Sequence, residues 1–184
     1  SFYARFFANG LPISTLHLDR PDMYTVGLFA YLLHYPIGHV SLEPVITTGG
    51  EETGGLVGKN GGTVHNASVS GSISGGSRTG GLVGFVSEGT VSNASVDANV
   101  NGGDETGGLV GGNDGDVIKS SAAGGVNGSK YVGGLVGNND GDVNRSDAIG
   151  EVDGSSYVGG LLGVSEGTVA EAHASGDVVG SDNY

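Results

Sequence analysis

The string Gly-Gly-Leu-Val-Gly at residues 54–58 decides the fold, because it returns along the chain at nearly constant spacing. Counting one copy with Leu in place of Val, it occurs five times, and its leucines are 26, 27, 26 and 26 residues apart. These leucines are Leu56, Leu82, Leu109, Leu135 and Leu161. Such a period is typical of proteins that stack one supersecondary unit on the next.

The similarity between the units extends well beyond the leucine. Each unit continues to a Gly-(Thr/Asp)-Val step, whose valines are Val64, Val91, Val117, Val143 and Val169. A small residue follows three positions later, and aliphatic or alanine residues follow at two further fixed positions. Residues 53–184 are therefore five copies of one unit, with a single insertion in the stretch 85–88.

The composition of the unit favours short strands over helices. Glycine supplies 39 of 184 residues, and β-branched residues recur at alternate positions, a pattern that breaks helices and suits strands. The sequence predicts an all-β fold, a parallel β-solenoid in which each unit forms one coil and the five leucines point into the core. The expected coils are 53–78, 79–105, 106–131, 132–157 and 158–184.

Residues 1–52 have a different composition, since residues 1–48 hold 8 of the 12 aromatic residues and only 3 of the 39 glycines. We expect an aromatic-rich cap on the first coil or an assembly segment. Short strands or one helix near residues 24–34 both suit its pattern. If this segment contacts the last coil of another copy, the solenoids join head-to-tail. The expected assembly residues are Phe2, Tyr3, Phe6, Phe7 and Tyr184.

The charge balance excludes several classes of partner. Seven basic residues stand against 20 acidic ones, which gives a net charge of −13. Such a chain repels a phosphate backbone, so we expect no nucleic-acid partner. The apolar stretch at 24–33 is too short to span a membrane. An acidic surface of this kind suits either a salt-adapted source, such as a halophilic archaeon, or an ordinary secreted protein.

The repeat resembles a known motif. Gly-Gly-Leu-Val-Gly, then Asn-x-Gly-x-Val, then Asn-Ala-Ser, as in residues 54–68, looks like the GLUG motif. That motif occurs in tandem in large prokaryotic surface or secreted proteins, including those that carry immunoglobulin A-cleaving metallopeptidases of the M26 type. The resemblance implies a β-solenoid with an extracellular or cell-surface location, and it names no reaction.

Two groups of side chains are candidate sites. Asn113-Asp114-Gly115-Asp116 and Asn139-Asp140-Gly141-Asp142 occupy equivalent positions in adjacent coils. Stacking would bring Asp114 near Asp140 and Asp116 near Asp142. A calcium ion bound by these carboxylates would relieve the repulsion between them. The alternative is a pair of acidic turns whose carboxylates are exposed to water, which also weakens the repulsion. Apart from calcium, no cofactor is expected.

Four Asn-x-Ser sequons form the second group, and they predict glycosylation of a secreted protein. Asn66 and Asn93 occupy equivalent positions, so they suit a stacked asparagine ladder equally well. The sequons begin at Asn66, Asn93, Asn127 and Asn144.

No motif in the sequence points to an enzyme, because the chain has no cysteine and no His-Glu-x-x-His string. We therefore expect no catalytic residue and no catalytic activity. The sequence favours an extracellular structural protein, a self-associating filament or matrix subunit joined head-to-tail. The alternative is an adhesin, a module of a larger secreted protein that binds glycans or proteins, with Tyr131 and Tyr157 placed to stack on a sugar ring.

Overall fold

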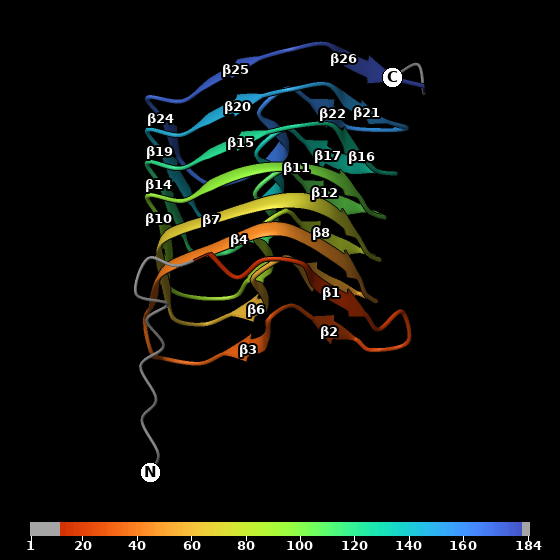
Figure 1. The fold of residues 1–184 in the computed structure, drawn as a ribbon. Coiled ribbons are helices and arrows are strands. Elements are labelled where there is room, and N and C mark those ends of the chain that lie inside the picture. The colour runs from red at the N-terminus through yellow and green to blue at the C-terminus, as the bar shows by residue number, and fades with distance from the viewer. Residues whose placement is uncertain (1–11, 182–184) are drawn as a thin grey trace.

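Short runs of alternating apolar and polar residues, separated by glycines, form strands throughout residues 12–181, the part of the chain that this computed structural model describes. The chain winds into a parallel β-solenoid of about six turns with coils of about 26 residues, as predicted. Figure 1 shows the coils stacked one above the other, from β1–β4 at one end to β22–β26 at the other. Residues 12–181 contain no helix, and so none that could cross a membrane.

The coils contribute strands to three sheets. The first sheet has 14 strands and forms the long face of the solenoid. Its strands are β1 (Leu16–Asp19), β4 (Ile37–Thr48), β7 (Thr63–Ser74), β10 (Thr90–Ser92), β11 (Ser95–Asn101), β14 (Asp116–Ile118), β15 (Ser121–Ala123), β16 (Val126–Asn127), β19 (Asp142–Asn144), β20 (Asp147–Ile149), β21 (Val152–Gly154), β24 (Val169–Ala170), β25 (His173–Ser175) and β26 (Val178–Gly180).

The second and third sheets have six strands each, one from every coil. The second sheet contains β2 (Thr25–Val26), β5 (Glu52–Gly54), β8 (Arg78–Gly80), β12 (Glu105–Gly107), β17 (Tyr131–Gly133) and β22 (Val158–Gly159). The third sheet contains β3 (Phe29–Leu32), β6 (Val57–Asn60), β9 (Val83–Val86), β13 (Val110–Asn113), β18 (Val136–Asn139) and β23 (Leu162–Ser165).

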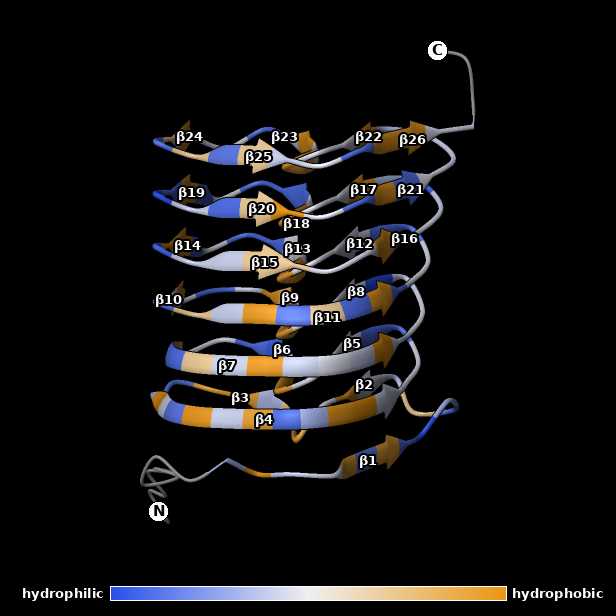
Figure 2. Ribbon diagram, turned by 45° about the horizontal axis from the view of Figure 1, so that its top comes forward, coloured by the Kyte–Doolittle hydropathy of each residue, from blue (hydrophilic) through white to orange (hydrophobic). Residues whose placement is uncertain are grey.

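Residues of the same repeat position lie directly above one another. Val91 pairs with Val64 below it and with Val117 above it, and the ladders between coils are parallel. Figure 2 shows the consequence along β4, β7 and β11, where apolar and polar residues alternate. The side chains therefore form vertical columns, alternately inside and outside the solenoid.

The core consists of the inward columns. Leu56, Leu82, Leu109 and Leu135 are fully buried, whereas Leu161 in the last described coil is only partly buried against the core. Valines and alanines fill the neighbouring columns and make a narrow core that continues from one coil to the next. A single coil buries little surface, so the stack rather than the coil is the stable unit.

A sixth coil precedes the five repeats. The strands β2, β3 and β4 stack in register on β5, β6 and β7 of the first repeat. The repeat pattern did not predict this coil, because Val26, Leu32 and Ile37 fill its inward positions without the Gly-Gly-Leu-Val-Gly string. Beneath it, β1 extends only the first sheet by pairing with β4.

A column of residues in the left-handed backbone region forms one corner of the solenoid. Asn66 and Asn93 have φ of 49°, and Lys119 and Arg145 have φ of 49° and 53°. Asparagine adopts this conformation more readily than lysine or arginine. The first-sheet strand is continuous through this corner in the first repeat, and in the later repeats it is interrupted there, between β10 and β11, β14 and β15, β19 and β20, and β24 and β25.

Candidate functional site

The acidic turns lie where the repeat predicted. Asp116 is the direct ladder partner of Asp142. Partial burial raises the pKa of the Asp114 carboxyl, and the nearby charge of Asp140 raises it further. Stacking therefore does bring acidic residues of adjacent coils together, and the charge of Asp140 adds to the effect of burial on the pKa of Asp114.

A metal ion needs more ligands than each of these pairs supplies. Within residues 12–181, no group of three or more His, Asp or Glu side chains is placed to hold a metal ion, whereas calcium takes six to eight oxygen ligands. Calcium binding at Asp114, Asp116, Asp140 and Asp142 stays a prediction.

The asparagines of the four sequons lie on or near the surface in different settings. Asn66 and Asn93 are exposed at the left-handed corner, and the Nδ2 atom of Asn66 lies 3.2 Å from Nδ1 of His65. Asn127 is exposed at the end of β16, and Asn144 is half-buried in β19.

Hydrogen-bonded amides stack inside the solenoid, at the first residue of each acidic string, to which the sequence assigned no role of its own. Asn113 donates from Nδ2 to Oδ1 of Asn139 at 2.7 Å, and Asn139 donates to Oγ of Ser165 at 3.1 Å. Both asparagines also donate to the carbonyl two residues ahead. The column is broken at Val86, which lies beneath Asn113, and Oδ1 of Asn113 is buried without a hydrogen-bond partner.

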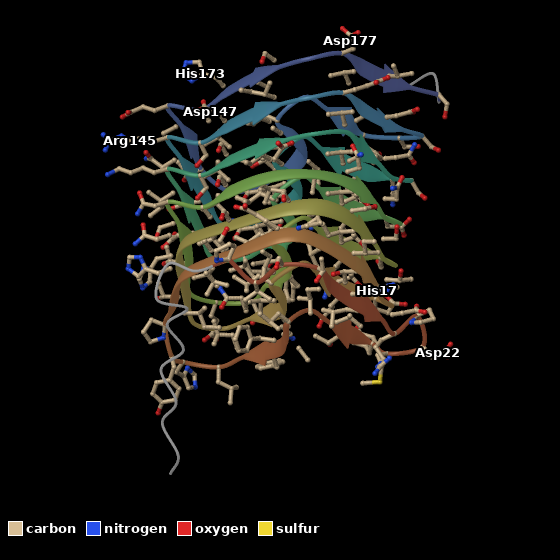
Figure 3. The ribbon with its side chains drawn as sticks, viewed as in Figure 1. His17, Asp22, Arg145, Asp147, His173 and Asp177 are labelled. Carbon is tan, nitrogen blue, oxygen red and sulfur yellow. The ribbon has the colours of Figure 1, made fainter. Side chains whose placement is uncertain are left out.

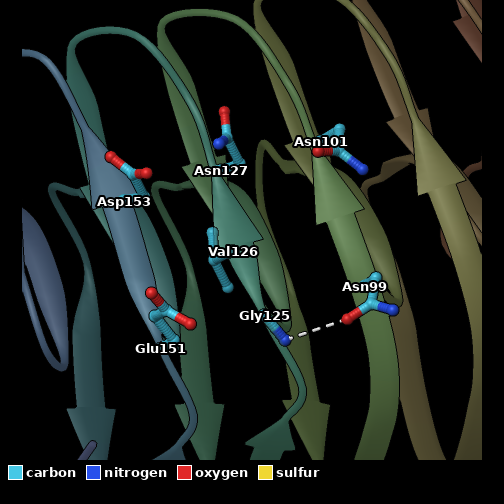
Figure 4. A pocket seen from close by; sticks show the side chains of 7 residues that line it. All are labelled: Asn99, Asn101, Gly125, Val126, Asn127, Glu151 and Asp153. Carbon is cyan, nitrogen blue, oxygen red and sulfur yellow. Dashed lines mark hydrogen bonds between the residues drawn. The ribbon is translucent and has the colours of Figure 1, made fainter. Parts of the chain in front are cut away.

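A polar hollow of about 370 Å³ opens on the first sheet over Gly125 (Figure 4). In the parallel ladders, Asn127 pairs with Asn101 of the coil below and with Asp153 of the coil above. Glycine at 125 leaves open space between Asn99 and Glu151, and its N–H donates to Oδ1 of Asn99 at 3.2 Å. The walls thus carry amide and carboxylate groups and no basic side chain.

The hollow was missed because its residues are far apart in the sequence and match no motif. Aligning the repeats gives a usable signal, however. Polar residues stand on both sides of the inward Val100 and Val152, whereas the equivalent Val126 is preceded by Gly125.

A charged column runs along the second sheet. Arg78 lies between Glu52 and Glu105, with Nη1 3.3 Å from Oε1 of Glu52 and Nε 2.9 Å from Oε2 of Glu105. Partial burial lowers the pKa of Arg78, but the hydrogen bond to Glu105 and the two carboxylate charges outweigh it, so the pKa is raised. The guanidinium carbon also lies 4.2 Å from the ring centroid of Phe85, a cation–π contact.

Tyr131 and Tyr157 continue this column. Tyr131 is the ladder partner of Glu105, and the two tyrosine ring centroids are 5.2 Å apart. Tyr157 is 60% exposed. The rings thus contact each other and leave one of them open to solvent.

Ion pairs also join the upper coils at the surface. Figure 3 shows His173 and Asp147 on adjacent coils, and Nδ1 of His173 is 3.3 Å from Oδ1 of Asp147. Arg145 donates from Nε to Oε2 of Glu171 at 2.8 Å. All four side chains are more than half exposed, so these pairs contribute little to stability.

The expected assembly residues, namely Phe2, Tyr3, Phe6, Phe7 and Tyr184, lie outside the described residues.

Comparison with known proteins supports the repeat assignment. Residues 49–74 match the family model described as "The GLUG motif". The chain is also similar to Halomucin of Haloquadratum walsbyi, with 38% identity over 77 residues, which is 41% of this chain and 1% of Halomucin. No solved structure matches the chain. The chain therefore carries the GLUG motif and is distantly similar to a short segment of Halomucin.

Proposed function

We propose that this chain is a structural module of an extracellular or cell-surface protein, and that its solenoid is extended by end-to-end contact with another copy. The GLUG motif and the similarity to a segment of Halomucin, a secreted protein of a halophilic archaeon, support the location. The acidic surface, with a net charge of −13, suits such a setting.

The exposure of the last described coil is the observation that carries the proposal. Val169 and Val178 are 42% and 47% exposed, whereas their ladder partners Val143 and Val152 are 1% and 0% exposed. A further coil stacked on this face would bury these valines as the lower coils bury theirs. Hydrophobic burial then supplies the driving force.

The opposite end of the solenoid is also apolar. Tyr24 is 63% exposed, Tyr31 51% and Leu33 58%. The strands β2 and β3 form the edges of the second and third sheets at this end, and unpaired edges are templates for pairing with another chain. Two different faces in contact give a heterologous interface, which propagates into filaments unless it closes into a ring.

Sedimentation velocity over a range of chain concentrations, with electron microscopy, tests the proposal. Val178→Lys at one end and Leu33→Lys at the other should each abolish association, because each places a charge in the interface. Ile149→Lys is the matched control, since Ile149 is 59% exposed on the side of the first sheet. A single monomeric species at every concentration would contradict end-to-end association, and so would loss of association in the Ile149 variant.

The same measurement with a chelator tests the calcium hypothesis. Filaments that dissolve on chelation and return with calcium would assign the metal to the stacked aspartates, provided that Asp116→Asn removes the response. Filaments unaffected by the chelator would exclude a role for calcium in assembly.

Tyr157 supports a second candidate function, binding of surface glycans. Its ring is 60% exposed, and aromatic faces stack on sugar rings through their apolar body. A glycan array probed with the chain and with Tyr157→Ala distinguishes the candidates. Binding that the variant loses favours an adhesin, whereas self-association without glycan binding favours the structural module.

A further inference from the structure

The four sequons differ in whether a transferase could reach them on the folded chain. Transfer of a glycan needs the asparagine amide and the hydroxyl two residues later, so both must be exposed. Ser129, which completes the sequon of Asn127, is exposed, and so is Asn127 itself. The Asn127 side chain makes no hydrogen bond in the described structure.

Asn144 fails this requirement. Its partner hydroxyl belongs to Ser146, which is fully buried. The Oγ atom of Ser146 donates to the carbonyl of Asn144 at 3.0 Å and accepts from N of Ser120 at 3.1 Å. This sequon is therefore part of the core packing and is closed to a transferase.

The two sequons at the left-handed corner belong to the first sheet, with Asn66 inside β7 and Asn93 in the break between β10 and β11. Ser68, the partner of Asn66, donates from Oγ to Oγ of Ser41 at 2.8 Å, in the middle of β7. At the Asn93 sequon both Asn93 and Ser95, the first residue of β11, are exposed, so exposure alone does not distinguish this sequon from that of Asn127. Neither Asn66 nor Asn93 lines the hollow over Gly125, whereas Asn127 does.

Asn127 lies instead at the end of a strand and beside space. It is the last residue of β16, Gly128 and Ser129 follow in the turn toward the second sheet, and the hollow over Gly125 adjoins its side chain (Figure 4). A volume of about 370 Å³ is within the range of small-molecule sites.

We propose that Asn127 is the acceptor of an N-linked glycan whose first sugar lies in the hollow over Gly125. The Nδ2 atom attacks the anomeric carbon of a sugar activated as a lipid-linked phosphate ester. The new C–N bond forms as the C–O bond to phosphate breaks, the electron pair leaves with the phosphate, and the amide proton passes to a base of the transferase.

The chemistry of the walls selects the sugar. Glu151 and Asp153 accept hydrogen bonds from hydroxyl groups, and Asn101 can donate or accept. No basic side chain lines the hollow, so a uronic acid or a sulfated sugar would be repelled. These walls therefore favour a neutral hexose or N-acetylhexosamine as the first sugar.

Transfer in vitro to the purified, folded chain tests the proposal, with an oligosaccharyltransferase and a lipid-linked donor that carries a neutral first sugar. In a cell, modification also rests on the extracellular location proposed above. The purified system separates the test of the glycan acceptor from the test of the proposed function, because end-to-end association is measured independently of glycan transfer.

Mass spectrometry should find the glycan on Asn127. Asn127→Gln and Ser129→Ala should each abolish most of the added mass, whereas Asn144→Gln should leave it unchanged. A glycan found on Asn144 of the folded chain, or found at Asn66 or Asn93 while Asn127 stays bare, would overturn the assignment of the acceptor.

Thermal unfolding tests the position of the sugar. The glycosylated chain should have a higher Tm than the unmodified chain, and the difference should vanish in the double variant Glu151→Ala, Asp153→Ala, in which Asn127 is still modified. An unchanged difference in Tm in the double variant would show that the sugar does not lie in the hollow.

Discussion

At the scale of single residues, the inward polar groups are the most constrained. Asn139 accepts a hydrogen bond from Asn113 and donates to Ser165 and to the carbonyl of Gly141. A buried polar group that loses its partner keeps its full desolvation penalty. The stacked amides therefore hold adjacent coils in register only as long as each has its neighbours.

Asn139→Ala should lower the free energy of unfolding by about 1–3 kcal/mol, because it leaves the amide of Asn113 with one acceptor fewer in a buried site. Urea unfolding followed by circular dichroism measures the change. Asn101→Ala, at an exposed position, is the control and should change stability by less than about 0.5 kcal/mol. Equal effects of the two substitutions would refute the role of the buried column.

Asp114 gives a prediction about pH. Its pKa is raised in the folded state above the ordinary value of 3.8, by partial burial and by Asp140. As the pH rises from about 3.8 through the raised pKa, the folded chain holds the proton longer than the unfolded chain does. The folded state thus loses stability over this window, and the loss is complete above it.

Asp114→Asn should remove this loss, so the variant should gain stability relative to the parent chain between pH 3.5 and pH 7. Denaturant unfolding at both pH values measures the gain. Asp97→Asn is the control for the general reduction of negative charge, since Asp97 pairs with Ser70 and Ala123 in the ladder. No gain beyond that of the control would contradict the interaction with Asp140.

At the scale of the elements, the Gly-Gly-Leu-Val-Gly step brings the backbones of two sheets into contact. A Cβ atom at Gly111 would lie 2.6 Å from the carbonyl oxygen of Gly84 and 2.7 Å from N of Thr79. Both neighbours are backbone atoms held in ladders, so they cannot move aside. The last glycine of the step is required because no side chain fits there.

Gly111→Ala should therefore destabilise the solenoid by about 1–3 kcal/mol or prevent folding. Gly125→Ala is the matched control, because a Cβ atom there meets only Oδ1 of Asn99, at 3.4 Å. It should leave stability within about 0.5 kcal/mol of the parent chain. Comparison of the two Tm values tests the argument, and a larger loss at Gly125 than at Gly111 would refute it.

At the scale of the whole molecule, the net charge of −13 opposes folding, because it concentrates like charges on one compact surface. The Debye length, over which salt screens these charges, shortens from about 10 Å at 0.1 M salt to about 3 Å at 1 M. Raising the NaCl concentration from 0.1 M to 1 M should therefore raise the Tm.

A less acidic variant separates charge screening from other effects of salt. The triple variant Asp97→Asn, Glu151→Gln, Asp153→Asn should have a higher Tm at low salt and a smaller response to added NaCl. Differential scanning calorimetry measures both. A Tm of the parent chain that falls with salt, or an identical salt response in the variant, would contradict a dominant role of charge repulsion.

The sequence by itself determined the repeat, the all-β class and the identity of the core leucines. Each of these follows from a local pattern, since a strand alternates with period two and a stacked unit repeats its inward residues at a fixed spacing. Leu56, Leu82, Leu109 and Leu135 are fully buried because each lies above or below its own copy.

Only the tertiary structure decided which residues of different coils meet across the stack. The coil of residues 25–48 lacks the signature string, and stacking on β5, β6 and β7 revealed it. The amide column of Asn113 and Asn139 and the hollow over Gly125 likewise join residues about 26 positions apart. Such contacts depend on the inward or outward direction of each side chain at the corners. That direction is set by the backbone of the whole stack rather than by any local run of sequence.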